Sequence, residues 1–346
     1  MRTHAGIPVS QGNALRMMAV WSCVSLIADG VASLPVDTYR EVKRKRVPVD
    51  TPAWLTSPNP YMTSFDFWHR VMVSLLLDGN AFIAVYRNGG GEVSALMPID
   101  PGRVSIHAEE ETGEVYYRLD GERYTRSQIL HVPAFTRPGE LRGLSPIEYA
   151  RQVIGLGLAA EEYGARFFSQ GTTMSGVIQH PGNPSREQVV MIRDMFKKAH
   201  SGIKNSHAVG ILTGGATWQS ITITPEQAQF LETRKFQKVE IANLYRVPAY
   251  MIDPTVTSTW GTGIEEQNKW FVDQTLMPWI VRLEEAFSTH LLPGNVRMRF
   301  NVNARLRAKT KERYESYAIA LEKGFMTVDE VRALEDMEPM SAPVAV

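Results

Sequence analysis

Two stretches decide how the chain is organised: GLSPIEYARQVIGLGLAAEEYGARFFSQG at residues 143–171 and TPEQAQFLETRKFQKVEIANLYRVPAYMIDPTVTSTWGTG at residues 224–263. The first predicts a helix on chemical grounds. Ser145 is a suitable N-cap, Pro146 suits the first helical position, and Glu148 stands where a capping box places a carboxylate.

The second stretch predicts a helix that begins with the same chemistry. Thr224 can cap it, Gln227 can reach back to the cap, and Pro248 prevents the helix from running much further. The two helices bracket an insert at residues 175–223. Strands are predicted there in SGVIQH, AVGILTGG and ATWQSITI, and a helix in SREQVVMIRDMFKKAH, so the insert is a small α/β module.

The segment DPTVTSTWGTG at residues 253–263 is dense in Pro, Thr and Gly and shows no periodicity, which predicts an exposed loop. Thr262 and Glu265 can then cap a long helix over residues 264–292. Pro278 lies inside this helix and predicts a bend.

The remaining sequence predicts an α+β fold. Residues 1–12 lack periodicity and predict a loose arm, and helices are expected over residues 13–33 and 64–78 and again in the last part of the chain. Strands are expected in PVDTYRE, NAFIAVYRN, EVSALMPID, RVSIHAE, VYYRLDG, RYT, ILHVPAF and VRMRFNV.

The charge balance limits the classes of function. Lys plus Arg and Asp plus Glu both number 37 among 346 residues, so the basic excess typical of a protein that grips nucleic acid is absent. Neutrality suits a protein through which DNA slides, and equally one that never meets DNA. The basic run at residues 43–46 contains no aromatic residue that could stack on a base, which favours a solvated hairpin tip over a nucleic-acid site.

Cys23 is the single cysteine and lies in an apolar helical run, so it is expected to pack in the core of a protein folded in a reducing cytoplasm. The apolar run at residues 17–28 is shorter than the roughly 20 residues of a membrane span, and no signal-peptide pattern precedes it. No membrane association is therefore expected.

Several segments, taken in order, resemble the portal proteins of tailed bacteriophages, specifically the type named after phage HK97. They are AVWSCVSLIADGVASLPVDTYR, SPNPYMTSFDFWHRVMVSLLLDGNAF, the first stretch quoted above, QAQFLETRKFQKVEIANLYRVPAYMID and IEEQNKWFVDQTLMPWIVRLEEAF. The resemblance covers roughly residues 15–340 and rests on the co-occurrence of these segments, since no single motif is diagnostic.

The resemblance implies the portal fold and divides the chain as follows: a flexible arm at 1–12, the first part of a wing at 13–143, stem helices at 144–172 and 224–247 around a clip at 173–223, a tunnel loop at 248–263, a bent wing helix and strand at 264–303, and a crown at 304–346. The crown is short, which truncation of a longer chain would explain.

The resemblance also implies a function. Portal proteins of this type form a ring of about twelve copies at one capsid vertex, through which double-stranded DNA is packaged and ejected. The implied partners are the large terminase, which hydrolyses ATP, the head-tail adaptor, and the major capsid and scaffold proteins. The implied location is the virion, after synthesis in the host bacterial cytoplasm.

Small residues punctuate the first stem helix, and the resemblance assigns them to packing between subunits: Gly155, Gly157, Ala160 and Gly164. Glycine inside a helix costs about 1 kcal/mol relative to alanine, so its repeated use indicates close backbone approach. Ordinary packing within one chain is the alternative.

Three further sets of residues are candidates for contact with DNA or with partners. The second stem helix carries Arg234, Lys235 and Lys238, which either border the channel or form a solvated face of mixed charge. The tunnel loop offers Thr255, Thr257, Ser258, Thr259 and Trp260; its hydroxyl groups can make exchangeable phosphate contacts, and Trp260 can alternatively anchor the loop to the wing. The clip carries Lys197, Lys198 and Lys204, which suit an acidic partner, the DNA entrance, or solubility alone.

Catalytic patterns are missing from the sequence. It contains no phosphate-binding loop of the Gly-x-x-x-x-Gly-Lys type, no Gly-x-Ser-x-Gly elbow and no His-Glu-x-x-His motif, so we expect neither catalysis nor a metal or other cofactor. Three hypotheses remain: a passive ring-forming conduit, which the order of segments favours, a hydrolase with a site assembled from distant residues, and a nucleic-acid-binding monomeric module.

Overall fold

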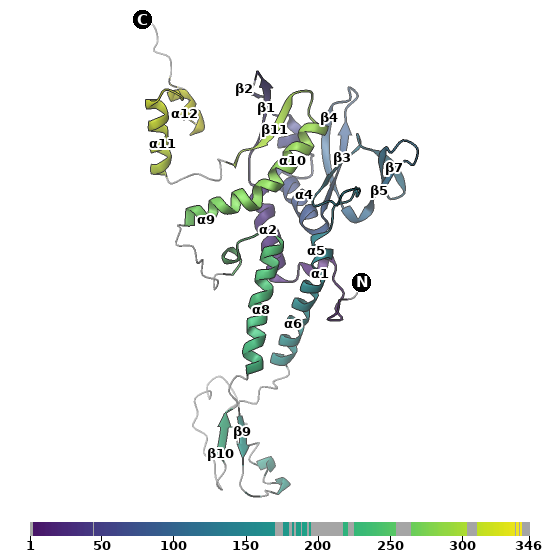
Figure 1. The fold of residues 1–346 in the computed structure, drawn as a ribbon, viewed down its shortest axis with the longest axis vertical. Coiled ribbons are helices and arrows are strands. Elements are labelled where there is room, and N and C mark those ends of the chain that lie inside the picture. Colours follow the sequence, from purple (N-terminus) through teal and green to yellow (C-terminus); the bar gives the residue numbers. More distant parts are fainter. Residues whose placement is uncertain are drawn as a thin grey trace. The chain divides into compact units, whose positions relative to one another are not determined.

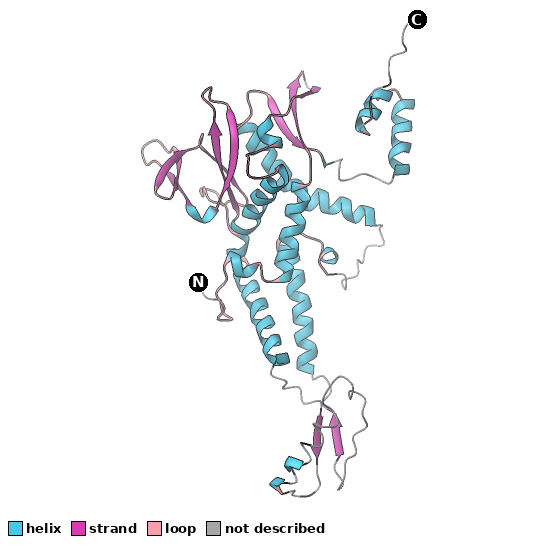
Figure 2. Ribbon diagram, turned by 180° about the vertical axis from the view of Figure 1, so that it is seen from behind, coloured by secondary structure: helices cyan, strands magenta, loops and turns pink. Residues whose placement is uncertain are grey.

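The computed structural model describes residues 3–43, 45–169, 176–179, 217–220, 225–253, 264–302 and 310–335, together with isolated positions between 182 and 194 and between 337 and 340. The described chain separates into two compact units (Figures 1 and 2). One comprises residues 1–9 and 151–241, and the other residues 10–150 and 242–346. Helices and antiparallel sheets occur in separate groups, so the α+β class is confirmed.

The larger unit is built on two packed helices, α2 (Met18–Ala32) and α4 (Ser64–Asp78). Thr63 caps α4 in a capping box with Asp66, and Gly79 ends it in the left-handed region at φ 80°. The helices bury apolar faces against each other because their large side chains recur at helical spacing. Short helices flank them at α1 (Gln11–Ala14) and α3 (Ala53–Thr56).

Three antiparallel sheets of the larger unit contain the strands that the sequence predicted there and one further strand, β2, that it did not. The first has the order β11–β1–β2, the second β4–β3–β8 and the third β5–β6–β7. Their bounds are β1 (Val36–Val42), β2 (Lys45–Val49), β3 (Asn80–Arg87), β4 (Val93–Ile99), β5 (Val104–Ala108), β6 (Val115–Leu119), β7 (Glu122–Thr125), β8 (Ile129–Pro133) and β11 (Val296–Phe300). A single 3-10 turn, η1 (Pro101–Arg103), joins β4 to β5.

Lys43, Lys45 and Arg46 of the basic run lie at the tip of the β1–β2 hairpin, as the sequence favoured. Lys43 has a positive φ of 48° there, and the guanidinium of Arg46 lies 5.1 Å from the ring centre of Tyr39. This hairpin is solvent-exposed on its β2 strand.

An aromatic cluster forms the core between α4, α10 (Met277–His290) and β11. Trp68 contacts Phe67, Phe287 and Phe300 with ring centres 5.1, 4.7 and 5.0 Å apart, and all four side chains are fully buried. Such pairs each contribute about 0.5–1.5 kcal/mol beyond the burial of their area. Side chains of α4, α10 and β11 therefore share one core within the larger unit.

The bend predicted at Pro278 takes a specific form. Between α9 (Ile264–Trp270) and α10 lies a π-helical segment, Phe271–Leu276, and Pro278 occupies the first turn of α10. Proline lacks an N–H and its ring crowds the preceding turn, so widening that turn accommodates it within a continuous helical run.

Two predicted helices are divided. The helix expected over residues 13–33 is broken because Met17 is extended, with φ −72° and ψ 115°; both Met17 and Ala14 are buried. The first stem helix is broken at Ala150 into α5 (Pro146–Tyr149) and α6 (Arg151–Ser169), and the boundary between the two units falls at this break. The capping pattern at Ser145 was correct but applies to the four-residue α5.

The smaller unit contains α6 and most of α8 (Pro225–Leu244), which lie side by side in both views (Figures 1 and 2). Its described sheet pairs β9 (Gly176–Gln179) with β10 (Thr217–Ser220), in agreement with two of the three strands expected in the clip. The strand expected at 208–215 lies outside the described residues.

The N-terminal segment differs from the loose arm expected at residues 1–12. Thr3 is buried, its hydroxyl donates to the carbonyl of Ile7 at 2.7 Å, and the amide of His4 donates to Gln152 Oε1 at 3.0 Å. A Cβ on Gly155 would lie 2.5 Å from Thr3 Cγ2. Gly155 thus leaves the space in which the segment docks on α6, a contact that composition alone does not predict.

Two helices, α11 (Thr310–Glu322) and α12 (Val328–Leu334), confirm the helices expected in the crown. Thr327 and Glu330 form the capping box of α12. Glu335 links the two helices: its carboxylate accepts a hydrogen bond from Arg313 Nη2 at 2.8 Å and one from the hydroxyl of Tyr317 at 3.0 Å, within an ion pair with Arg313.

Candidate functional site

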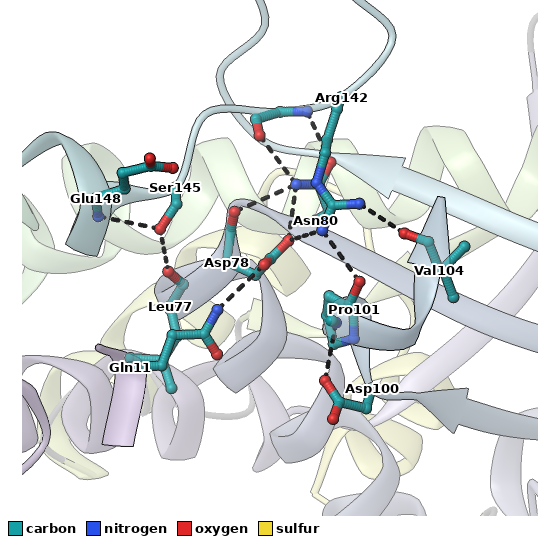
Figure 3. A network of polar contacts seen from close by, with 12 residues as sticks. Gln11, Leu77, Asp78, Asn80, Asp100, Pro101, Val104, Arg142, Ser145 and Glu148 are labelled. Carbon is teal, nitrogen blue, oxygen red and sulfur yellow. Dashed lines mark hydrogen bonds and ion pairs between the residues drawn. The ribbon is translucent and has the colours of Figure 1, made fainter. Parts of the chain in front are cut away.

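Polar contacts join the end of α4 to the segment that leads into α5 (Figure 3). Asn80 is fully buried; its Nδ2 donates to Gly143 O at 2.9 Å, and its Oδ1 accepts from Gly143 N at 2.7 Å. The side-chain amide thereby pairs with the backbone as a neighbouring strand would. Because an unpaired buried polar group costs about 1–3 kcal/mol, this pairing holds the segment firmly.

His131 on β8 takes part in the same contacts between the end of α4 and the segment that leads into α5. Its Nε2 lies 3.0 Å from Asn80 Oδ1, and its ring stacks on Phe82 with centres 4.5 Å apart. Asn80 Oδ1 is an acceptor, so Nε2 must carry the proton. Burial, followed by the charges of Arg142 and Arg126, lowers the pKa of His131 to about 4, which keeps the ring neutral at physiological pH.

Arg142 connects α4, the η1 turn and β5 of the larger unit. Nη1 donates to Val104 O at 2.9 Å, and Nη2 donates to Pro101 O at 3.1 Å and to Asp78 Oδ1 at 2.9 Å. The Asp78 side chain is largely buried, so its pairing with a guanidinium avoids an uncompensated buried charge. The other oxygen of Asp78 accepts from Gln11 at 3.1 Å.

Two glycines make the joint sterically possible. A Cβ on Gly79 would lie 2.1 Å from Leu144 O, and a Cβ on Gly143 would lie 2.2 Å from Gly79 O. Ser145 completes the joint, since its hydroxyl donates to Leu77 O at 2.7 Å and accepts from the amide of Glu148 at 3.2 Å. This joint (Asp78–Asn80 with residues 142–145) fixes where α5 begins.

The end of α8 has its own anchor in the larger unit. The hydroxyl of Tyr245 donates to Leu76 O at 3.1 Å, and the hydroxyl of Thr275 donates to Arg246 O at 2.5 Å. Arg246 itself has a positive φ of 55°. Burial raises the pKa of Tyr245, and it raises the pKa of the nearby Cys23 thiol to about 12, so Cys23 is an unreactive core residue as predicted.

The structure describes both ends of the predicted tunnel loop but not its middle. The 3-10 turn η3 (Ala249–Met251) leads to the buried Asp253, and α9 starts at Ile264. Thr255, Thr257, Ser258, Thr259 and Trp260 lie outside the described residues, as do Lys197, Lys198 and Lys204 of the clip. Their roles stay predictions.

The candidate charges of the second stem helix lie on α8 and take part in ion pairs. Arg234 Nη2 is 3.7 Å from Glu161 Oε1 on α6, and Lys235 Nζ is 3.7 Å from Glu232 Oε1. Arg234 and Lys235 are exposed, whereas Lys238 is partly buried. The pair between Arg234 and Glu161 links the two helices, and whether these charges border a channel stays a prediction.

The small residues of α6 are mostly covered within the chain. Gly155, Gly157 and Gly164 are buried and Ala160 is partly buried, and Gly155 is covered by Thr3. The exposed side chains of α6 include two large apolar ones that the sequence reasoning missed, Leu156 and Tyr163, at 51% and 61% exposure. Their spacing of seven residues places them on one helix face, a signal that was available in the sequence.

The described ranges contain no group of three or more His, Cys, Asp or Glu side chains placed to hold a metal ion. Among these same residues, no helix is both long and apolar enough to cross a membrane.

Comparisons with known proteins agree on one family. The family model described as phage portal protein matches residues 18–336. The chain is 37% identical to the "Probable portal protein" of Streptomyces phage phiC31, over 97% of this chain and 78% of the relative. It is 31% identical to the "Portal protein" of Enterobacteria phage HK97, over 96% of this chain and 81% of the relative.

A solved structure has the same fold. It is described as the neck of a native gene transfer agent particle computed with C12 symmetry, and the TM-score is 0.69 at 21% identity. The match covers 95% of this chain and 94% of that chain.

Proposed function

Because the chain belongs to the phage portal protein family, we propose that it forms the portal ring of a tailed phage or prophage, at one capsid vertex of the virion. The ring is the conduit for double-stranded DNA during packaging and ejection. The observation that carries this proposal is the family match over residues 18–336, and the C12 symmetry of the neck with the same fold supports a ring of twelve copies.

The stem is where we place contacts between subunits. The small residues Gly157, Ala160 and Gly164 let neighbouring backbones approach, whereas the space at Gly155 is filled by Thr3 of the same chain. The exposed Leu156 and Tyr163 supply apolar surface for a second copy. Phe236, at 63% exposure on α8, adds a further apolar side chain.

The channel and the outer end use the residues proposed from the sequence. Thr255, Thr257, Ser258, Thr259 and Trp260 of the tunnel loop face DNA, and Arg234, Lys235 and Lys238 border the channel. Rings repeat each charge in every subunit, so even a neutral chain presents a patterned field to DNA. Lys197, Lys198 and Lys204 contact the terminase and the head-tail adaptor.

The proposed protein hydrolyses nothing and needs no cofactor. Its further partners are the major capsid and scaffold proteins, and its synthesis takes place in the host cytoplasm.

The test is the mass of the purified protein in solution together with negative-stain images. A particle of about twelve chains with a central hole is the expected result. A strict monomer that binds DNA with a steep salt dependence would instead favour the nucleic-acid-binding monomeric module.

A further inference from the structure

A cavity of about 390 Å³ lies within the larger unit, beside β6, β8 and α10. The cavity is lined by two arginines, Arg126 and Arg282, and by aliphatic side chains that include Val115, Val132 and Leu141. Its volume is at the lower end of the range for small-ligand sites, roughly 300–1,000 Å³. None of the candidate DNA or partner residues takes part in it.

Arg282, on α10, lines the cavity, and only part of its guanidinium group is hydrogen-bonded. Its Nη1 donates to Pro133 O and to Ala134 O, both at 2.7 Å. Its Nε is buried and has no hydrogen-bond partner, and among the described residues no carboxylate lies within ion-pair distance. Burial lowers the pKa of Arg282, as expected for a cation that has lost water without gaining an anion.

Arg126 adds a second positive charge to the same lining. Its charge and a hydrogen bond offset part of the rise that burial causes in the pKa of Tyr117, and its charge contributes to the lowered pKa values of His131 and His290. Within the described part of the chain, Arg126 has no acidic partner either.

The remaining titratable groups of the lining do not balance these charges. Glu140 is the acidic member, but both of its oxygens accept from Arg137, at 2.5 and 3.1 Å. His131 is neutral, as described above, and burial followed by the charge of Arg126 lowers the pKa of His290. The cavity therefore presents two guanidinium groups, an aliphatic wall and no free anion of its own.

We propose that this cavity binds a carboxylate that carries a short hydrocarbon chain, with Arg126 and Arg282 as its counter-charges. Guanidinium groups match carboxylates in planar geometry and charge, and a buried one gains most from an anion. The aliphatic wall suits the hydrocarbon part and does not suit a nucleotide. The carboxylate belongs either to a small organic acid or to an acidic side chain of a partner polypeptide.

Isothermal titration calorimetry on the purified full chain tests the site with two probes. One is glutarate, with its neutral diamide as the matched control, and the other is the peptide acetyl-Val-Glu-Val-amide, with the Gln peptide as its control. We expect at least one acidic probe to bind and Arg126→Gln to weaken its binding about tenfold, which corresponds to about 1.4 kcal/mol, since the variant removes one of the two counter-charges. Glutarate binding alone identifies a small acid, and preference for the Glu peptide identifies a protein side chain.

Arg118→Gln is the matched control variant. Arg118 lies on β6 next to the lining residue Tyr117, and alternation along the strand places it on the opposite face of the sheet. It should leave binding unchanged. Arg126 is exposed, so its substitution is not expected to disturb folding. The proposal is overturned if neither acid binds at millimolar concentration, if the neutral controls bind equally well, or if Arg126→Gln binds like the wild type.

Discussion

The side chain of Asn80 exchanges two hydrogen bonds with the backbone of Gly143, at 2.9 and 2.7 Å, although 63 positions separate the two residues. Substitution of Asn80 by Ala would leave both buried backbone groups of Gly143 without partners. We therefore expect Asn80→Ala to lower the free energy of unfolding by about 2–4 kcal/mol in urea denaturation. Asn243→Ala, at an exposed position of α8, is the control and should change it by less than about 0.5 kcal/mol. Equal effects would show that the joint does not stabilise the larger unit.

Gly79 has a left-handed backbone and no room for a Cβ, whereas Gly113 has a left-handed backbone with open space around it. Their φ angles are 80° and 69°, but a Cβ on Gly79 would lie 2.1 Å from Leu144 O, whereas a Cβ on Gly113 would meet nothing within 4 Å. Gly113→Ala should cost about 1–2 kcal/mol from the backbone alone. Gly79→Ala should lower the free energy of unfolding clearly more, because the backbone at Leu144 must move to make room for the added Cβ. The shift of the urea midpoint measures this difference. A similar cost for the two variants would rule out the close approach.

The exposed residues Leu156 and Tyr163 of α6 allow subunit packing to be tested by substitutions that should leave the fold of the single chain intact. We expect the double variant Leu156→Glu with Tyr163→Glu to abolish rings in negative-stain images while circular dichroism stays unchanged, because like charges would then face each partner helix. Gly157→Leu is expected to impair assembly too, but Gly157 is buried, so that variant also strains the helix itself. Intact rings of the double variant would contradict the proposed interface.

Triple reversal of Arg234, Lys235 and Lys238 to Glu tests whether α8 borders the DNA path. Exposed ion pairs contribute about 0–1 kcal/mol each, so folding should survive the loss of the pairs with Glu161 and Glu232. DNA packaged per particle, measured by nuclease protection, should fall severalfold. Unaffected packaging would indicate that these residues face away from DNA.

His131 predicts a specific dependence of stability on pH. Its pKa is about 4 in the folded chain and near 6.5 when unfolded, so between these values the unfolded state binds more protons. Stability therefore falls as the pH drops from about 6.5 to about 4, with a total contribution of about 3 kcal/mol. His290, whose pKa burial also lowers, acts in the same direction. In His131→Gln the slope of unfolding free energy against pH should be much reduced over this window, and an unchanged slope would assign the dependence to other groups.

Local chemistry allowed much of the fold to be predicted. Capping pairs such as Thr63 with Asp66 and Thr327 with Glu330 form as expected, because they involve residues three positions apart and need no tertiary partner. The alternating strands and the hairpin tip at Lys43 could also be predicted, because they depend on residues that are close in sequence. The order of such segments was also sufficient to indicate the family.

The candidate site could be predicted only in part. The positions of Arg234 and Lys235 on α8 followed from periodicity, but their partners did not, because Glu161 is brought near by the pairing of two helices. Ser145 was expected to cap one long stem helix and instead caps a short α5. Its second contact, with Leu77, depends on helix α4, 68 positions away in sequence.

Local spacing and the order of segments were enough to predict most helices and strands and the family, and the neutral charge follows from composition. The tertiary structure was needed to show that Asn80 serves as a backbone partner for Gly143, that Thr3 fills the space at Gly155, and that Arg126 and Arg282 share a cavity without a free anion. The physical reason is that burial and unmet hydrogen bonds are properties of neighbours in space, and long-range packing selects those neighbours.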